Sequence, residues 1–298
     1  MTFNVLHGRP MRDGRPVPEA GETGQAFAEA VAALDADVLA LQELDRLQER
    51  SGRVDQAALA AEAMGARDWR YASALHGRPA PGAGWVLDPA EPGLRVHGPR
   101  DARAASAVPS HGIALLTRLP VHQWRARRFA AAPVGLPLRV AGQSGLTKVP
   151  DHSRAALAAV LEGGTGPFTV VALHLSFVPG WNTAHLAAVR RWIADLPAPH
   201  LLLGDFNLPG PLPRAVLGTA GLLDGAARAG RRSRAEARPP APDGWRDLAR
   251  VPTYPSHRPV VQFDHVLASG IPESSVQAVH TPLTPVSDHR PLAVHLAC

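Results

Sequence analysis

Several apolar runs along the chain end abruptly in a polar or charged residue. The clearest is LLLGDFNLPG, residues 201–210, in which three leucines lead towards Asp205 and Asn207 before Pro209 interrupts the backbone. A buried strand that releases a carboxylate and a carboxamide at its carboxyl end is typical of an active-site edge. Similar runs predict further strands at 2–6, 35–45, 111–121, 154–160, 168–177, 260–269 and 287–296.

The spacing of Asp205 and Asn207 allows two interpretations. On extended backbone, residues two apart point to the same side, so one ion or one phosphate meets both side chains. The alternative is an Asx turn, in which Asp and Asn bond only to nearby backbone amides. Taken alone, these two residues favour neither interpretation.

Amphipathic periodicity predicts three helices, at 25–34, 55–64 and 182–197. Asp55 is expected to cap the start of the second helix, and Gly65 to end it. The third helix has the strongest pattern, and its apolar face consists of Leu186, Val189, Ile193 and Leu196. Because it lies between the runs at 168–177 and 201–210, it predicts a strand, helix, strand unit, with Asn182 or Thr183 as its cap.

Two stretches carry no periodic pattern. Residues 74–110 are rich in Gly, Pro and Ala and predict mostly loop. Residues 225–244 contain five arginines and no apolar face, so we expect a flexible basic surface loop. The rest of the pattern is interpreted as one domain spanning residues 1–298.

Composition limits the class of protein. The chain has no apolar run of about eighteen residues and no leader pattern, which predicts a cytoplasmic protein without a membrane span. Because the first strand begins at residue 2, we also expect the natural start to lie upstream. The only cysteine, Cys298, excludes an internal disulfide and a cysteine metal site. The formal charge of +5 resides almost wholly on arginine, which favours an anionic ligand only weakly, since base composition of the genome also enriches arginine.

Eight polar residues stand at the ends or starts of the apolar runs. They are Asn4, Glu43, His174, Asp205, Asn207, Asp264, Asp288 and His289. Burying carboxylates and imidazoles costs several kcal/mol unless they are paired or bind metal, so chance placement of so many is not expected.

The motifs that carry these residues resemble the endonuclease/exonuclease/phosphatase family. In chain order they are TFN at 2–4, LQE at 41–43, LLTRLPV at 115–121, SRAAL at 153–157, LHLSF at 173–177, GDFN at 204–207, FDHVL at 263–267 and SDH at 287–289. The resemblance covers nearly the whole chain. It implies an α+β fold, a four-layer α/β sandwich of two face-packed mixed β-sheets flanked by helices, with the site at one end.

The resemblance also implies a phosphoester hydrolase in which an activated water attacks in line with the leaving oxygen. Hard oxygen ligands indicate Mg²⁺ or Mn²⁺, and we expect the metal to bind to Glu43, Asn4 and Asp288. The phosphate-binding residues are expected to be His174, Asn207 and Arg154. The alternative for Arg154 is that it is only a surface charge. Asp205 is expected to orient the water or to assist the leaving group. His289 is expected to be the base and Asp264 to fix its ring, the alternative being that His289 only donates to phosphate.

The sequence defines the substrate less narrowly than it defines the reaction. Abasic-site repair enzymes of this family carry an acidic residue where this chain has Leu6, and inositol phosphatases carry a Trp, Cys, Asp, Arg stretch where it has VVQFDHV at 260–266. We expect a phosphate-ester substrate, with nucleic acid among the candidates, and infer no protein partner. The function most favoured is a phosphodiesterase or nuclease. The alternatives are a phospholipid or small-molecule phosphatase of the same fold and an inactive phosphate-binding module.

Overall fold

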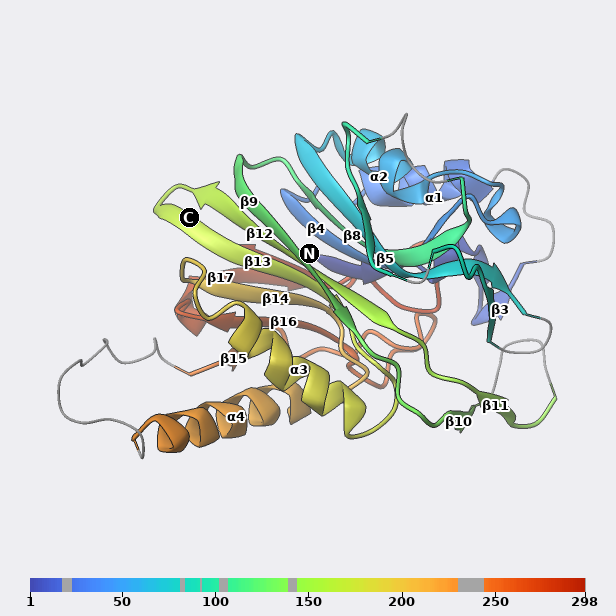
Figure 1. Ribbon diagram of the computed structural model, residues 1–298. Coiled ribbons are helices and arrows are strands. Elements are labelled where there is room, and N and C mark those ends of the chain that lie inside the picture. Colours follow the sequence, from blue (N-terminus) through green and yellow to red (C-terminus); the bar gives the residue numbers. More distant parts are fainter. Residues whose placement is uncertain are drawn as a thin grey trace.

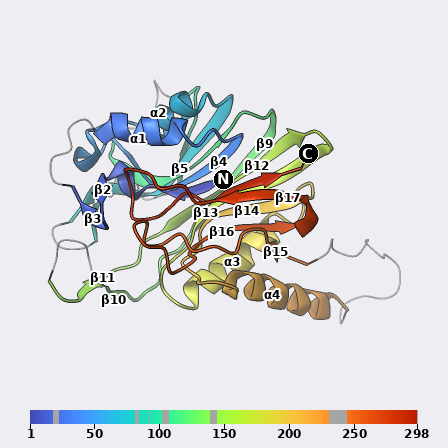
Figure 2. The same cartoon turned by 180° about the vertical axis from the view of Figure 1, so that it is seen from behind.

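The computed structural model describes residues 1–17, 23–80, 84–91, 93–101, 107–138, 144–229 and 244–297. Two mixed β-sheets pack face to face in the middle of the molecule, and helices lie on their outer faces (Figure 1). Figure 2 shows the same layers from behind, with the C-terminal strands running beside the sheets.

The first sheet has the strand order β1-β4-β8-β5-β6, and β7 also pairs with β5. Only the β1 and β4 pair is parallel, while the pairs of β5 and β8 with their neighbours are antiparallel. The strands are β1 Thr2–Asn4, β4 Val38–Arg46, β5 Asp68–Pro79, β6 Trp85–Leu87, β7 Arg95–His97 and β8 Ser110–Thr117.

The second sheet has the order β15-β16-β14-β13-β12-β9. Here β13 and β14 are parallel and joined through a helix, as the strand, helix, strand pattern predicts. The strands are β9 Val121–Phe129, β12 Arg154–Gly163, β13 Gly166–His174, β14 His200–Asp205, β15 Arg246–Asp247 and β16 Asp264–Ser269.

Side chains that point alternately to the two faces of each strand produce the layers. In β4, Leu39 and Leu41 face the helices of the first sheet, whereas Ala40 between them faces the second sheet. In β12, Leu157 points into the space between the sheets and Ala158 points to the opposite helices. A period of two therefore gives the central strands two apolar faces, so both sheets are covered on both sides.

In the described ranges, four α-helices form the outer layers. Helices α1 Thr23–Ala32 and α2 Gln56–Met64 pack on the first sheet, and helices α3 Trp181–Trp192 and α4 Leu212–Ala229 pack on the second. The expected α+β four-layer sandwich is therefore confirmed. None of the helices in the described ranges has the length and apolar character needed to cross a membrane.

The expected helix signals are confirmed in α2 and partly wrong in α3. The Asp55 side chain accepts a hydrogen bond from the Ala58 backbone N–H, and Gly65 adopts the left-handed conformation (φ 66°) that ends the helix. Helix α3 instead has Gly180 at its N-cap, without a side-chain cap. Asn182 lies inside the helix, where its amide donates to the Asn207 carbonyl at 3.0 Å.

The expectation that residues 74–110 are mostly loop is wrong in part. Strand β5 continues through Pro79, and β6 and β7 lie in the same stretch. Strand β9, at the edge of the second sheet, was not predicted because VHQWRARRF, residues 121–129, lacks a clean apolar alternation.

Three further expectations are corrected. Residues 225–229 belong to α4 rather than to a loop, and the rest of the stretch to 243 lies outside the described residues. The run at 260–269 forms a strand only from Asp264. The run at 287–296 is strand only in β18 Ala293–Leu296, which pairs with β17 Val276–His280 in a separate two-stranded sheet, so Asp288 and His289 lie in the loop before it.

Candidate active site

Three neighbouring strands of the second sheet bring site residues into one row. His174 at the end of β13 pairs in register with Asp205 at the end of β14, and Asp205 pairs with Asp264 at the start of antiparallel β16. Gly204 permits the close approach of β13 and β14, because a Cβ there would meet the Leu173 carbonyl oxygen at 2.0 Å. The GDFN motif thus sets the register of this edge.

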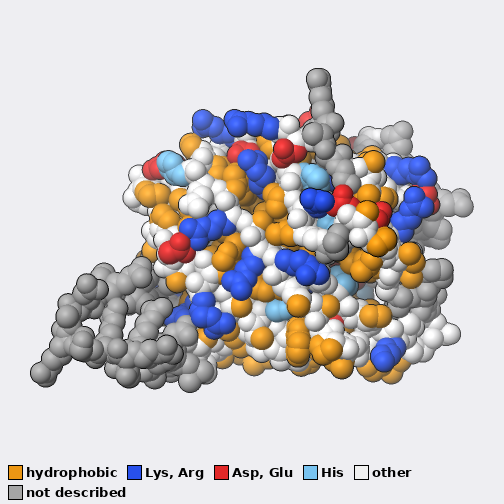
Figure 3. Space-filling model, viewed as in Figure 1, with side chains coloured by type: hydrophobic (Ala, Val, Ile, Leu, Met, Phe, Trp, Pro, Cys, Tyr) orange, Lys and Arg blue, Asp and Glu red, His pale blue; other side chains and the backbone are white. Residues whose placement is uncertain are grey.

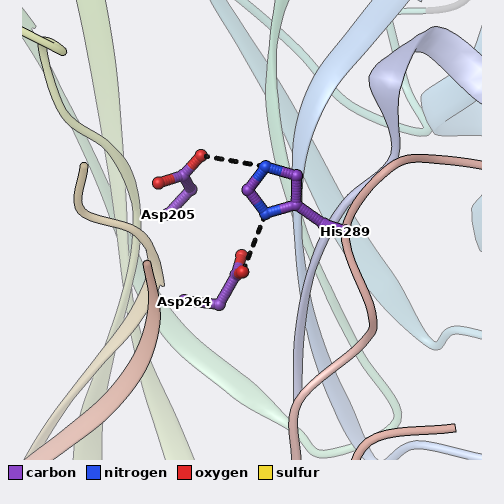
Figure 4. Close-up of side chains that lie close together, drawn as sticks. All are labelled: Asp205, Asp264 and His289. Atoms are coloured by element: carbon purple, nitrogen blue, oxygen red, sulfur yellow. Dashed lines mark hydrogen bonds and ion pairs between the residues drawn. The ribbon is translucent and has the colours of Figure 1, made fainter. Parts of the chain in front are cut away.

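His289 and Asp264 form a buried pair at the end of this row. Nδ1 of His289 lies 2.8 Å from Oδ2 of Asp264, and Figure 4 shows the other ring nitrogen facing Asp205. The Thr253 hydroxyl donates to the same Asp264 oxygen at 2.5 Å. The expected contact is present, although it joins a strand to a loop and not two neighbouring strands.

The loop that carries His289 is fixed to the first strand. The Ser287 hydroxyl donates to the Asn4 carbonyl oxygen at 2.6 Å and accepts from the His289 backbone N–H at 3.0 Å. The Tyr254 ring lies 4.9 Å from the His289 ring, measured between centroids. These contacts hold the imidazole without occupying its Nε2.

Asp205 lies between two histidines. Its Oδ2 is 3.8 Å from Nε2 of His174 and 3.9 Å from Nε2 of His289, and it accepts a hydrogen bond from the Asn4 amide at 3.0 Å. Burial raises the pKa of Asp205 to about 6, and the charge of Asp264 adds to the rise while that of His289 opposes it. A gap of 3.9 Å is wide enough for one water oxygen to bridge Asp205 and His289.

The pKa of His289 is raised to about 10. Burial alone would lower it, but the charge and hydrogen bond of Asp264, followed by the charges of Asp205 and Asp288, outweigh burial. In this environment the imidazole carries a proton at neutral pH.

Glu43, Asn4 and Asp288 form the acidic side of the site. A β-bulge in β4 between Leu41 and Leu44 gives Glu43 a positive φ of 58° and directs it towards Asn4, whose amide donates to it at 3.1 Å. Burial raises the pKa of Asp288, and the charges of Glu43 and Asp264 add to this. Burial also acts to raise the pKa of Glu43, but the charge of His111 and the Asn4 bond lower it overall.

This acidic side fits a divalent cation by its donor chemistry. Two carboxylates and an amide oxygen are ligands that magnesium accepts, and the mutual repulsion of Glu43 and Asp288 is what a cation would relieve. The Asn4 amide oxygen also accepts a hydrogen bond from the Leu6 backbone N–H at 3.1 Å, so only part of its capacity to bind a metal ion remains. A second grouping, Asp205, Asp264 and His289, has ligand atoms within 4.8 Å of one another, but Asp264 and His289 already bond to each other there.

Arg154 and His174 form the cationic side. Arg154 is buried, with Nη1 at 3.1 Å from Nε2 of His174 and Nη2 at 3.6 Å from Asp151, so the surface-charge alternative is wrong. Its Nε has no hydrogen-bond partner among the described residues. Burial, followed by the charge of Arg154, holds the pKa of His174 well below its usual range, so this imidazole is neutral.

Asn207 lies in an Asx turn. Its backbone N–H donates to Oδ1 of Asp205 at 2.9 Å, and its φ is 50°, so the extended interpretation of the Asp205 and Asn207 spacing is wrong. The Asn207 amide donates to the Leu175 carbonyl at 3.1 Å. One amide hydrogen remains for another acceptor.

Sequence reasoning missed several residues around the site. His111 was not singled out as a site residue, and it bonds to the buried Asp45 at 2.8 Å. Asp45 follows Glu43 by two positions on the same strand, which was an available signal. Thr253 had no signal, because it lies in an irregular stretch far from the apolar runs.

Comparisons with known proteins identify the family of the chain. The sequence matches the model of the Endonuclease/Exonuclease/phosphatase family over residues 1–289. The chain belongs to this family. As a member it is a hydrolase acting on phosphoester bonds, and enzymes of this family generally depend on a divalent metal. No curated protein matches the sequence.

Solved structures of the family share the fold at low identity. An endonuclease/exonuclease/phosphatase from Beutenbergia cavernae DSM 12333 is 20% identical with a TM-score of 0.55, covering 99% of this chain and 70% of that one. A family protein from Leptotrichia buccalis C-1013-b is 13% identical with a TM-score of 0.55, covering 100% and 98%. One from Bacteroides vulgatus is 16% identical with a TM-score of 0.53, covering 99% and 97%. These likenesses support the fold alone.

Proposed function

We propose that the protein is a Mg²⁺- or Mn²⁺-dependent phosphodiesterase that hydrolyses its substrate by in-line attack of a water. The observation that carries this proposal is the row of His174, Asp205 and the Asp264–His289 pair, with an acidic side and a cationic side flanking it. The row supplies groups for a water, and the two sides supply groups for the charge on a phosphate.

The phosphate is held by the cationic side. Arg154 is fixed by His174 and Asp151 and supplies positive charge, while neutral His174 and the free amide hydrogen of Asn207 offer hydrogen bonds. Because these groups are already positioned, charge that develops on the phosphoryl oxygens is stabilised without reorganisation. A divalent cation bound by Glu43, Asn4 and Asp288 would neutralise phosphoryl charge and offset the acidic field that keeps the pKa of His289 high.

The attacking water lies between His289 and Asp205 in this mechanism. Nε2 of His289 accepts its proton, Asp205 orients it by a second hydrogen bond, and Asp264 holds the ring by Nδ1. Thr253 fixes Asp264 in turn.

The test is hydrolysis of bis-p-nitrophenyl phosphate by the purified protein with Mg²⁺, with Mn²⁺ and with excess EDTA. We expect release of nitrophenolate with either metal and loss of activity in EDTA. Parallel assays on p-nitrophenyl phosphate, plasmid DNA, RNA and sphingomyelin separate diesterase, monoesterase, nuclease and lipid activities. Full activity in excess chelator, or activity on the monoester alone, would overturn the proposal.

A further inference from the structure

A second group of charged and aromatic residues lies beside the hydrolytic site and is not used by the mechanism above. Asp45, fully buried on β4, faces His111 on β8 directly across the first sheet. Arg50, on the short helix η2 Glu49–Ser51, donates to Asp45 through Nε at 2.7 Å and through Nη2 at 2.9 Å. Two parallel bonds of this kind fix the plane of the guanidinium.

The Arg50 side chain is held from both sides but keeps an open edge. Its guanidinium carbon lies 5.3 Å from the centre of the Trp85 ring, which itself is 5.3 Å from the His111 ring. The side chain is 32% exposed, and Nη1 has no hydrogen-bond partner among the described residues. A rigid guanidinium with an unpaired outer edge binds an oxygen acceptor at little cost in side-chain entropy.

This group is continuous with the hydrolytic site. A pocket of about 20 Å³ lies between the two, and it is lined by His111 and Gly112 on one side and by His152, Arg154 and His174 on the other. His111 connects this pocket with Arg50, because its Nδ1 lies 3.4 Å from Nη2 of Arg50. An anion attached to a phosphoester bound at Arg154 would therefore reach Arg50 by extending past His111.

We propose that Arg50, fixed by Asp45 and Trp85, forms a subsite that receives a second phosphate group of the substrate. The proposal rests on the proposed phosphodiesterase function and specifies its substrate class. The subsite depends on one arginine that is fixed by two hydrogen bonds to Asp45 and by the Trp85 ring. On the face drawn in Figure 3, Lys and Arg side chains are scattered among apolar and neutral atoms. A substrate with a cationic group in this place, such as a phosphocholine ester, is disfavoured because Arg50 already covers the Trp85 ring.

Two matched pairs of chromogenic substrates test this subsite. The first pair is thymidine 5′-(p-nitrophenyl phosphate) with and without a 3′-phosphate, and the second is glyceryl p-nitrophenyl phosphate with and without a phosphate on the glycerol. We expect the second phosphate to raise kcat/KM roughly ten-fold, as a hydrogen bond to a charged group does. If the second phosphate raises kcat/KM in the thymidine pair only, the second phosphate belongs to a nucleotide chain. If it raises kcat/KM in both pairs, the subsite recognises the phosphate alone.

The variants identify the residue responsible. Arg50→Met should remove the gain while leaving hydrolysis of bis-p-nitrophenyl phosphate within about two-fold, and it should improve p-nitrophenyl phosphorylcholine as a substrate. Arg53→Met is the matched control, because Arg53 follows the same short helix, is 69% exposed and pairs with exposed Glu49. Arg50→Lys keeps a charge beside buried Asp45 but loses the fork, so it tests the subsite if Arg50→Met lowers the melting temperature.

The outcomes are separable from those of the proposed function. If bis-p-nitrophenyl phosphate is not hydrolysed with any metal, the phosphodiesterase proposal fails. If it is hydrolysed but the second phosphate gives no gain in either pair, or if both Arg50 variants keep the wild-type gain, the subsite is wrong.

Discussion

Replacing Asp264 by Asn should slow hydrolysis without dismantling the site. Oδ2 of Asp264 accepts from both His289 and Thr253, whereas Oδ1 is buried without a partner among the described residues. The Asn side chain can keep its oxygen towards both donors and place its amide in the vacant position, so the variant removes the charge and largely preserves the shape. A hydrogen bond to a charged partner contributes about 1.5–3 kcal/mol, which corresponds to a loss of roughly 10- to 150-fold in rate.

The pH profile gives the sign of the effect. The charge of Asp264 is a principal cause of the raised pKa of His289, so removing it lowers that pKa. A base acts in its deprotonated form, so the acid limb of log kcat against pH should move to lower pH in Asp264→Asn. The assay is release of nitrophenolate from bis-p-nitrophenyl phosphate in Mg²⁺ over a series of buffers.

A double-mutant cycle decides whether the two residues act as one unit. His289→Ala should cost roughly a hundred-fold or more, and the double variant should be close to His289→Ala alone. Asp247→Asn is the matched control, because Asp247 pairs with buried His265 at 3.3 Å outside the row, and it should reduce stability without moving the pH profile. Losses that multiply in the double variant, or an unmoved acid limb in Asp264→Asn, would refute the dyad.

Three further variants probe the other parts of the site. Glu43→Gln should raise the Mg²⁺ concentration needed for half-maximal activity at least about ten-fold while KM at saturating metal changes little, and an unchanged metal titration would remove Glu43 from the metal site. Thr253→Val should lower kcat several-fold through the lost hydrogen bond to Asp264, with recovery in Thr253→Ser; equal rates in the two variants would make the hydroxyl irrelevant. In EDTA, the raised pKa of Asp205 predicts a contribution to stability that is present below about pH 4 and lost as pH rises through about 6. The melting temperature of Asp205→Asn should therefore depend less on pH across that interval than the melting temperature of the wild type. Parallel curves of melting temperature against pH for the two proteins would contradict this prediction.

The sequence predicted the sheets better than the site. Strands buried on both faces, such as β12 and β14, give long apolar runs, and helix α2 carries both its cap and its stop as readable residues. Edge strand β9 has a mixed sequence, and edge strand β6 has only three residues, so neither gives a recognisable strand pattern. The resemblance to the family placed the eight polar residues in one site, which periodicity alone does not establish.

What the sequence could not predict depends on irregular backbone and on long-range contacts. The bulge that directs Glu43 and the turn that redirects Asn207 both require positive φ at residues other than glycine, which local propensity disfavours. The contacts of Thr253 with Asp264 and of Arg50 with Asp45 join irregular segments to strands. No periodic signal accompanies contacts of that type.

The two histidines beside Asp205 show how position in this site determines chemistry. Their Nε2 atoms are almost equally far from the same carboxylate oxygen, at 3.8 Å for His174 and 3.9 Å for His289, and both rings are buried. Burial acts to lower the pKa of both rings, but the charge of Arg154 lowers that of His174 further, whereas the charge and hydrogen bond of Asp264 raise that of His289. In the proposed mechanism His289 is therefore the base and His174 only forms hydrogen bonds with the phosphate. The division of roles between the two imidazoles therefore follows from the charged residues behind them and not from their distance to Asp205.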